Sequence, residues 1–437
     1  MVPDMREMKD SGVSGIGRIP KEWKVERAKY IVDQISKGNG ITKEQVADDG
    51  DIQCVRYGEI YSKYDNSFRE TFSLTNLKSI SSPKHISNGD ILFAGTGELI
   101  EEIGKNIVYL GDRPCLAGGD IVVLRHSQEP RFLNYAFNCA CSQKQKSENK
   151  AKLKVVHITG NDIGNIRIAF PNKMEQKRIA DFLDDKCAEI DAISADIQTE
   201  IDTLEAYKRS VITEAVTKGL DKNVPMKDSN VEWIGQVPED WGVSKLGNVL
   251  RLRNEKNYKP LEEVNLISLY TDKGVVQHSD LEKTSGNIAQ NADGYKVVHK
   301  NDIVVNIILA WMGAMGISKY EGVTSPAYDV YEIDEKRIVP HYCHYILRTP
   351  AMAGECYKYG RGIMMMRWRT YSSEFKKIKM PLPTLREQAK IADYLDDKSA
   401  EIESIIAQKQ EQLTILAEYK KSIIYEYVTG KKEVPVT

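Results

Sequence analysis

One short segment has the spacing of a cofactor-binding loop. Residues 93–97 read Phe-Ala-Gly-Thr-Gly, and FxGxG is the loop pattern with which methyltransferases let their backbone approach S-adenosylmethionine. Such enzymes also need an (N/D)-P-P-(F/Y/W) tetrapeptide that holds the target amino group. The chain has none, since residues 325–328, Ser-Pro-Ala-Tyr, lack the amide or acid and the second proline. We therefore interpret residues 93–97 as a turn. The alternative is a cofactor loop, which would make the chain a self-sufficient DNA methyltransferase.

A second group of residues resembles a metal site in its spacing. His341, Cys343 and His344 could place two ligands on one helical face, but no second pair of ligands accompanies them, and a metal site needs three or four. The patterns GxxxxGK(S/T), HExxH and GxSxG do not occur in the chain. We expect no catalytic residue, no metal ligand and no cofactor, and hence a non-catalytic protein.

Lysine and arginine gather in two segments, near residues 144–157 and 358–369. Such clusters bind nucleic-acid phosphates, and an arginine can also read guanine with two hydrogen bonds. The candidate DNA-binding residues are Lys144, Lys146, Lys150, Lys152, Lys154, His157, Lys358, Arg361, Arg367, Trp368 and Arg369. A solvated basic surface is the alternative interpretation of both segments.

The composition limits what these residues can do. The 437-residue chain is 41% hydrophobic and 28% charged, with a formal net charge of −2, so any DNA-binding surface must be local. The seven cysteines are odd in number and form no CxxC pair, which favours reduced thiols in a cytoplasmic protein. The absence of a long apolar run and of a secretory signal predicts that no membrane is involved.

These residues are set in a chain that repeats itself. Residues 9–25, KDSGVSGIGRIPKEWKV, match residues 227–243, KDSNVEWIGQVPEDWGV. Residues 171–190, PNKMEQKRIADFLDDKCAEI, match residues 383–402, PTLREQAKIADYLDDKSAEI. Matches of this length in register indicate a tandem duplication.

The longer repeat predicts a helix in each half. Apolar residues recur at spacings of three and four, and no proline or glycine interrupts the pattern before Gly219 and Gly430. About 40 helical residues would extend roughly 60 Å. The first apolar seam is Ile179, Leu183, Cys187, Ile190, Ile193, Ile197, Ile201, Leu204, Tyr207 and Val211. The second is Ile391, Leu395, Ile402, Ile405, Leu413, Leu416, Tyr419, Ile423 and Tyr427.

Between the repeats lie two inserts, residues 24–168 and 242–380, which show no obvious similarity to each other. Strand-like runs bounded by turn residues predict a mixed α/β fold for both. At the offset of the helical repeat, His157 falls on Arg369. The end and the start of the chain together rebuild the linker found in its middle, so we expect adjacent termini and two halves related by a pseudo-twofold axis.

The chain resembles the specificity subunit of type I restriction–modification systems over essentially its whole length. The resemblance is carried by IGxxPxxW at residues 16–23 and 234–241, by PxxxEQxxIADxLDDKxAEI in both halves, by WMGAMG with SPAYDVY, and by GRGIMMMRWR at residues 360–369. It implies an α/β (α+β) fold with two globular target-recognition domains, separated by two long antiparallel coiled-coil helices.

The expected domains are residues 1–170, the first target-recognition domain with its head segment; 171–220, the first spacer helix; 221–382, the linker and second recognition domain; and 383–437, the second helix and tail. The resemblance further implies that the two recognition domains read a bipartite, asymmetric site in double-stranded DNA. The implied partners are two methyltransferase subunits plus restriction/translocase subunits. Methyl donor and ATP would bind those partners.

The predicted helices are strongly acidic, with Asp181, Asp184 and Asp185 matched by Asp393, Asp396 and Asp397. This charge would repel phosphate, so the helices are better suited to protein contact, and a solvated acidic face is the alternative. A coiled-coil scaffold with no DNA role also remains an alternative function.

Overall fold

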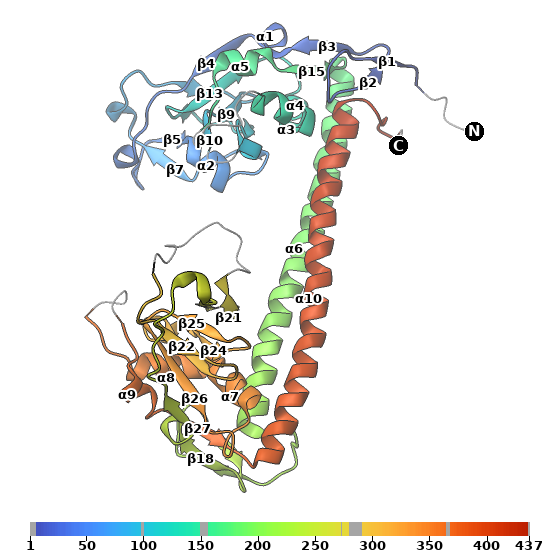
Figure 1. The fold of residues 1–437 in the computed structure, drawn as a ribbon. Coiled ribbons are helices and arrows are strands. Elements are labelled where there is room, and N and C mark those ends of the chain that lie inside the picture. The colour runs from blue at the N-terminus through green and yellow to red at the C-terminus, as the bar shows by residue number, and fades with distance from the viewer. Residues whose placement is uncertain are drawn as a thin grey trace. The chain divides into compact units, whose positions relative to one another are not determined.

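The computed structural model describes residues 6–97, 100–148, 156–271, 273–278, 291–363 and 368–435. The chain divides into two compact units, the first formed by residues 1–197 and 411–437 and the second by residues 198–410. Each unit therefore holds one insert together with a part of each long helix (Figure 1). Mixed α/β inserts with long helices confirm the expected fold class.

Unit 1 begins with a hairpin, which we call the first head, in which β1 (Met8–Asp10) pairs with β2 (Arg18–Pro20). β3 (Lys24–Arg27) then pairs with β15 (Arg167–Phe170), so the first insert begins and ends at neighbouring strands. We call the parts that repeat outside the inserts, the head and the long helix, the frame. The main sheet has the order β4-β13-β9-β11-β6, and a second sheet has the order β7-β5-β12-β8.

The bounds of the remaining strands in unit 1 are β4 (Gln34–Lys37), β5 (Ile52–Val55), β6 (Ser67–Phe68), β7 (Ser73–Thr75), β8 (His85–Ile86), β9 (Ile91–Ala94), β10 (Thr96–Gly97), β11 (Asn106–Tyr109), β12 (Cys115–Ala117), β13 (Ile121–Arg125) and β14 (Val156–His157). The short helices are α1 (Ala28–Ile31), α2 (Tyr57–Ser62), α3 (Pro130–Asn138), α4 (Ala140–Ser147) and α5 (Gly160–Asn165). β9 and β13 are almost wholly buried, which places the core on both faces of the main sheet.

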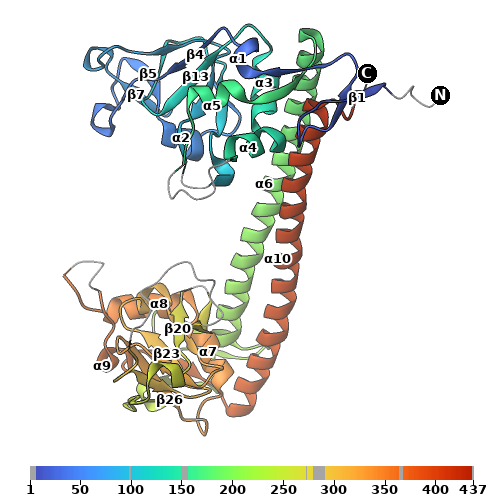
Figure 2. The ribbon, with the colours of Figure 1, turned by 45° about the horizontal axis from the view of Figure 1, so that its top comes forward.

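Unit 2 repeats this plan. Its second head pairs β16 (Met226–Asp228) with β17 (Gln236–Pro238), and β18 (Gly242–Lys245) pairs with β27 (Lys379–Leu382). The main sheet has the order β19-β26-β23-β24. Its strands are β19 (Leu250–Leu252), β20 (Ile267–Tyr270), β21 (Gly274–Gln277), β22 (Lys296–Val298), β23 (Ile303–Asn306), β24 (Met315–Ile317), β25 (Gly322–Thr324) and β26 (Tyr328–Ile333). The helices α7 (Pro340–Leu347), α8 (Pro350–Tyr359) and α9 (Ser372–Phe375) follow it (Figure 2).

The two inserts share a topology that their sequences do not reveal. β13 lies between β4 and β9, just as β26 lies between β19 and β23, with every one of these pairs antiparallel. In both units a helix that begins at a proline follows this strand, α3 after β13 and α7 after β26. Buried strands require only apolar side chains, so many sequences satisfy one sheet and the common fold leaves little identity.

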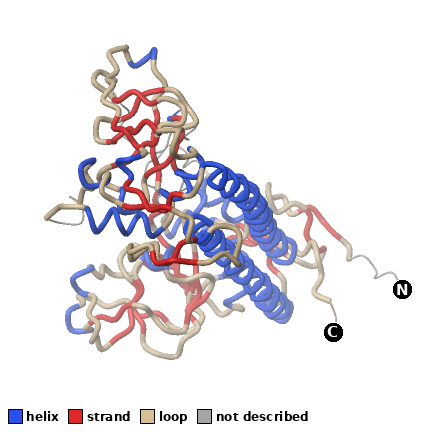
Figure 3. Tube along the Cα trace, turned by 90° about the horizontal axis from the view of Figure 1, so that it is seen from below, coloured by secondary structure: helices blue, strands red, loops and turns tan. Residues whose placement is uncertain are grey.

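The long helices are α6 (Lys173–Lys218) and α10 (Leu385–Val428), and Figure 3 shows them as two coils beside the sheets. Inside unit 1, Lys420 pairs with Asp191 at 2.7 Å, and inside unit 2, Lys208 pairs with Glu403. Higher numbers on one helix meet lower numbers on the other, so the helices are antiparallel within each unit.

The predicted apolar seam is only partly buried. Residues near each globular part, such as Leu183 and Leu395, are fully buried. Four members of the predicted seams are instead exposed by 36–52% of their surface, because only a second helix covers this stretch within each unit. They are Ile193, Tyr207, Ile405 and Tyr419.

Each head is closed by a helix end. The last turn of α10 packs on the first head, where a Cβ on Gly430 would come within 3.1 Å of the Trp23 ring. The last turn of α6 packs on the second head, where a Cβ on Gly219 would come within 3.2 Å of the Trp241 ring. Tyr425 also donates a hydrogen bond to the Gly15 carbonyl at 2.9 Å. The C-terminal helix and the N-terminal head therefore lie together in unit 1, as the circular repeat predicts.

Candidate nucleic-acid interface

The first basic segment begins on α4, and its two described lysines differ completely. Lys144 is exposed. Lys146 is only 1% exposed, and its ammonium nitrogen donates to the Gly104 carbonyl at 2.7 Å and to Asn106 Oδ1 at 2.9 Å. Burial lowers the pKa of Lys146 to about 7. The prediction that Lys146 contacts DNA is wrong for this fold, because its side chain points into the core.

His157, the other described candidate in unit 1, lies on β14, which pairs with β10. Its Nδ1 lies 3.0 Å from the Thr96 hydroxyl. Thr96 belongs to the FxGxG segment, whose Gly95 N–H donates to the Asp120 carbonyl at 2.6 Å. A Cβ on Gly95 would lie 2.8 Å from that carbonyl oxygen. The glycine thus serves backbone packing at a turn, as the sequence predicted.

A cleft of about 370 Å³ opens beside His157. Its walls come from β4, the turn before β13, the glycine segment and the start of α5. Lys37 and Asp120 form an ion pair at 3.4 Å there, with side chains 69% and 46% exposed. The Thr96 hydroxyl donates weakly to Asp120 at 3.4 Å. Neither residue of this ion pair can be recognised from the sequence, because they lie 83 residues apart in a region without a motif.

In unit 2 the corresponding segment has described residues on both sides of 364–367, and backbone hydrogen bonds join them. Arg361 and Arg369 exchange two N–H to carbonyl hydrogen bonds of 2.9 Å each. The Arg361 guanidinium is 70% exposed in its side chain and pairs with Glu374 at 2.8 Å. Trp368 stacks on Tyr357 with ring centroids 5.1 Å apart. An aromatic pair flanked by cations is a surface on which a nucleic-acid sugar or base could pack.

The remaining candidates are less informative. Lys358 is exposed, and its ammonium lies 3.6 Å from both Glu232 and Glu355. Lys150, Lys152, Lys154 and Arg367 lie outside the described residues.

The structure brings the two basic segments to equivalent places. Ile158, next to His157, donates its N–H to the Gly95 carbonyl at 2.9 Å. Thr370, next to Arg369, donates its N–H to the Ile307 carbonyl, also at 2.9 Å. In both units the segment therefore lies against the chain that leaves the central strands β9 and β23.

The acidic residues of the long helices have partners within the chain. In unit 1, Arg131 on α3 pairs with Asp181 and Asp184 at 2.7 Å each, and Tyr135 donates to Asp184. In unit 2, His341 and Tyr345 on α7 contact Asp396 at 2.9 and 2.7 Å. These carboxylates hold each insert on its long helix, a role that the acidic pattern alone did not reveal.

A buried glutamine strengthens the same junction in both units. The Gln176 side chain accepts from the Glu129 N–H and donates to the Pro171 carbonyl. The Gln388 side chain accepts from the Val339 N–H and donates to the Pro383 carbonyl. Both glutamines are 0% exposed. The Glu-Gln dipeptide repeated in both halves was the sequence signal for this joint.

The three residues with metal-like spacing are engaged separately. His341 faces Asp396, and His344 Nδ1 accepts the Ile317 N–H at 3.2 Å. Burial lowers the pKa of His344 to about 4, and Cys343 is fully buried. Within the described residues, no group of three or more His, Cys, Asp or Glu could hold a metal ion.

Within the same part of the chain, no helix combines the length and the apolar character that a bilayer span needs.

The model of the type I restriction modification DNA specificity domain matches residues 20–203 and again residues 238–414. The chain belongs to this family. Each match begins in a head and ends within a long helix, so the duplicated frame described above corresponds to two copies of the family's domain.

Curated relatives of this specificity-domain chain support the assignment. It is 28% identical over 434 residues to a protein of Methanocaldococcus jannaschii named as the MjaX specificity subunit of a type I restriction enzyme, covering 96% of both chains. It is 25% identical to the MjaVIII specificity subunit of the same organism, over 95% of this chain and 94% of the relative. The Escherichia coli EcoBI specificity subunit is 26% identical over 65% of this chain and 62% of its own.

Two solved structures show the same fold as this specificity-domain chain. A chain from a study of complex assembly and conformational transition in the type I R-M system superposes with a TM-score of 0.69 at 16% identity, covering 95% of this chain and 99% of that one. The HsdS subunit from Thermoanaerobacter tengcongensis superposes with a TM-score of 0.51 at 15% identity, covering 95% and 98%.

Proposed function

We propose that this chain is the DNA-reading specificity subunit of a type I restriction–modification complex, and that it has no catalytic activity of its own. Each insert reads one half of a split, asymmetric site in double-stranded DNA. The observation that carries the proposal is that both units have the same fold, with a basic segment at the equivalent place in each. The side chains on the two segments differ. Two copies of one frame with different surfaces are what two different half-sites require.

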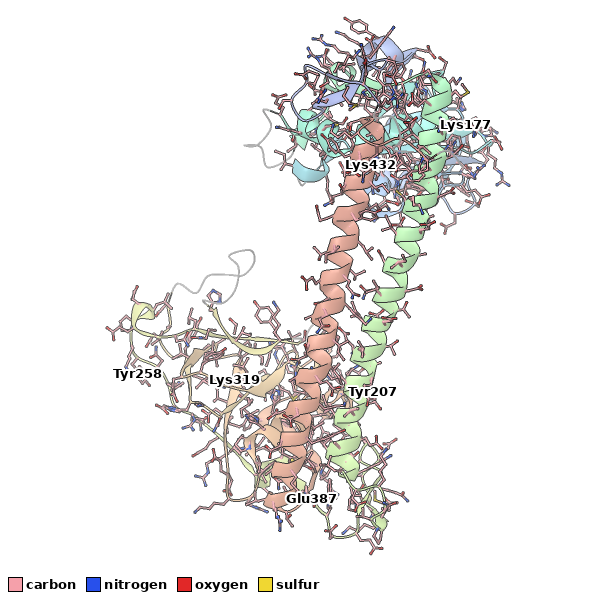
Figure 4. All side chains as sticks on the ribbon, turned by 90° about the vertical axis from the view of Figure 1, so that its right-hand side faces the viewer. Lys177, Tyr207, Tyr258, Lys319, Glu387 and Lys432 are labelled. Carbon is pink, nitrogen blue, oxygen red and sulfur yellow. The ribbon has the colours of Figure 1, made fainter. Side chains whose placement is uncertain are left out.

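The two long helices set the spacing between the half-sites. Methyltransferase subunits bind their exposed stretches, where Ile193 and Ile405, and likewise Tyr207 and Tyr419, are equivalent in the repeat and all exposed. Figure 4 labels Tyr207 on this stretch of α6. Two equivalent apolar surfaces favour two identical partner subunits. Restriction/translocase subunits join that assembly, and the partners bind methyl donor and ATP.

The DNA contacts in this proposal come from the basic segments without Lys146. Lys144 and His157 serve the first half-site, and Lys358, Arg361, Trp368 and Arg369 serve the second. Lys150, Lys152, Lys154 and Arg367 stay in the proposal on the strength of the sequence alone. The acidic helices do not contact DNA, since their carboxylates would repel phosphate.

The first test compares the purified chain with the chain plus its methyltransferase partner. The chain alone should transfer no methyl group, and the complex should methylate one split motif, which methylome sequencing of the host identifies. Methyl transfer by the chain alone would support a self-sufficient methyltransferase. A complex that ignores DNA sequence would support a scaffold without a DNA role.

The second test replaces Arg361 or Arg369 with alanine, with exposed Lys336 of the same unit as the control. An arginine that reads a base should cost about 1–3 kcal/mol of binding and relax one position of the second half-site. An arginine that contacts phosphate should weaken all sequences alike and lower the salt slope by about one. Salt titrations of DNA binding by the assembled complex separate these results. Two variants that behave like Lys336→Ala would place the interface elsewhere.

A further inference from the structure

The cleft in unit 1 combines two features that a base-reading site needs, which are exposed polar groups and a rigid support. The Lys37 ammonium and the Asp120 carboxylate meet at 3.4 Å with most of the lysine and nearly half of the aspartate side chain exposed. An ion pair this exposed contributes little to stability. DNA could therefore separate or share the two groups at small cost.

The rigid support is the close packing of two backbone segments, residues 38–40 and residues 118–119. Gly38, directly after Lys37, approaches Gly118 so closely that a Cβ would lie 2.1 Å from its carbonyl oxygen. Gly119, directly before Asp120, would place a Cβ 3.0 Å from the Cα of Gly40. The Gly38 N–H also donates to the Ile121 carbonyl at 2.8 Å. Gly38 thus has no room for a side chain and Gly119 has little, so close backbone packing holds Lys37 and Asp120 in place before any ligand arrives.

Unit 2 uses the equivalent strand differently. Where β13 carries Val122 on the cleft wall, the matching position of β26 carries Asp329, which pairs with Lys296 at 2.8 Å. Those side chains are only 22% and 13% exposed. The second pair is therefore part of the packing, whereas the pair in unit 1 faces the cleft. Two domains that read different targets must differ at the residues that contact DNA. The exposed ion pair in the cleft is such a difference between the two units.

We infer that the Lys37–Asp120 cleft reads a guanine–cytosine base pair of the first half-site from the major groove. The inference rests on the proposed DNA-reading function and deepens it. A lysine donates to guanine O6 and N7, and an aspartate accepts from the cytosine N4 amino group. One base pair presents these acceptors and this donor side by side, so the adjacent cation and anion match it together. His157 lines the same cleft, and the Thr96 hydroxyl contacts both His157 and Asp120.

The test introduces Lys37→Met and Asp120→Asn separately, since both changes keep most of the side-chain volume. Lys21→Met is the matched control, because Lys21 is also 69% exposed in an ion pair of unit 1, with Glu7 of the head. The assembled complex is tested by competition between duplexes in which each base pair of the motif is replaced in turn. The host methylome is sequenced in parallel.

Lys37→Met should lose about ten- to a hundredfold of discrimination at one G·C position of the first half-site, with the second half-site unchanged. Asp120→Asn should shift preference at that position towards A·T, because an amide matches adenine. Unchanged discrimination in both variants, a change only at A·T positions, or a uniform loss equal to that of Lys21→Met would overturn the inference. A native complex that recognises no split motif would instead overturn the proposed function.

Discussion

Both inserts contain a buried aspartate that is paired with an arginine, but the arginine comes from a different position in each. In both, an aspartate precedes the central strand and caps a turn: Asp90 accepts the Ser87 N–H, and Asp302 accepts the His299 N–H, at 2.8 Å each. Both aspartates are almost fully buried and are neutralised by an arginine.

The arginines come from different strands. Arg125 lies at the end of β13, whereas Arg253 directly follows β19. The buried charge and its need for a partner are therefore constant, while the position of the partner is free. The common fold of the two inserts therefore constrains the backbone and the balance of buried charge, and leaves the rest of each surface to diverge.

The sharpest difference in the interior is at α4 and α8. Lys146 is buried in unit 1, seven residues after the N-cap of α4, and Cys356 is buried in unit 2, seven residues after the N-cap of α8. A buried amine needs acceptors, which Gly104 and Asn106 supply. A buried thiol needs none, so the two cores differ in their response to pH.

The largest expected effect comes from truncating the chain so that only its first half remains. A chain that ends near residue 220 keeps residues 1–197 of unit 1 but loses residues 411–437. The lost part includes the last turns of α10, whose Tyr427 and Val428 are buried near the first head. The last turns of α6 have the related residues Ala215 and Val216, so a second copy can supply them and close a twofold dimer.

With methyltransferase partners present, this dimer should direct methylation of an inverted repeat of the first half-site. Size-exclusion chromatography and methylome sequencing test the two parts. A strictly monomeric fragment, or one that still marks the asymmetric site, would contradict the equivalence of the two halves.

A smaller effect should separate the two cores by pH. The pKa of Lys146 is lowered to about 7 in the folded chain, while that of an unfolded lysine is about 10.4. Between these values the unfolded chain binds more protons, so the contribution of Lys146 to the free energy of unfolding increases as pH rises and is lowest below pH 7.

The difference in unfolding free energy between the native chain and Lys146→Met should therefore grow by about 2–3 kcal/mol from pH 7 to pH 9. Urea titrations followed by pulse proteolysis report it for unit 1, and Cys356→Ala is the control in unit 2. A difference that does not depend on pH would show that Lys146 stays charged when buried.

The smallest effect compares the two Lys–Asp pairs. Lys296→Met should destabilise unit 2 by about 1–3 kcal/mol, since it leaves the largely buried Asp329 carboxylate without its cation. Lys37→Met should change the stability of unit 1 by no more than about 0.5 kcal/mol, because its ion pair is exposed. Thermal unfolding monitored by proteolysis of each unit measures both. Equal destabilisation would contradict the division into a structural pair and a ligand-facing pair.

The sequence by itself determined the duplication, the mixed α/β inserts and the two long helices, because repeats and helical periodicity are local properties that need no partner. It also placed His157 and Arg369 at equivalent positions, which the matching backbone hydrogen bonds next to them confirm. The interpretation of residues 93–97 as a turn followed from a missing motif and is consistent with the close packing of Gly95 on Asp120.

Tertiary structure alone decided which polar residues are available. Lys144 and Lys146 are neighbours in a basic segment, yet one is exposed and the other is in the core, because an α-helix turns 100° per residue and only one of its faces meets the sheet. Lys37 and Asp120 meet because β4 pairs with β13, a long-range contact that no local pattern encodes. The same holds for the aspartates of the long helices, whose charge the sequence displays and whose partners on α3 and α7 only the folded chain supplies.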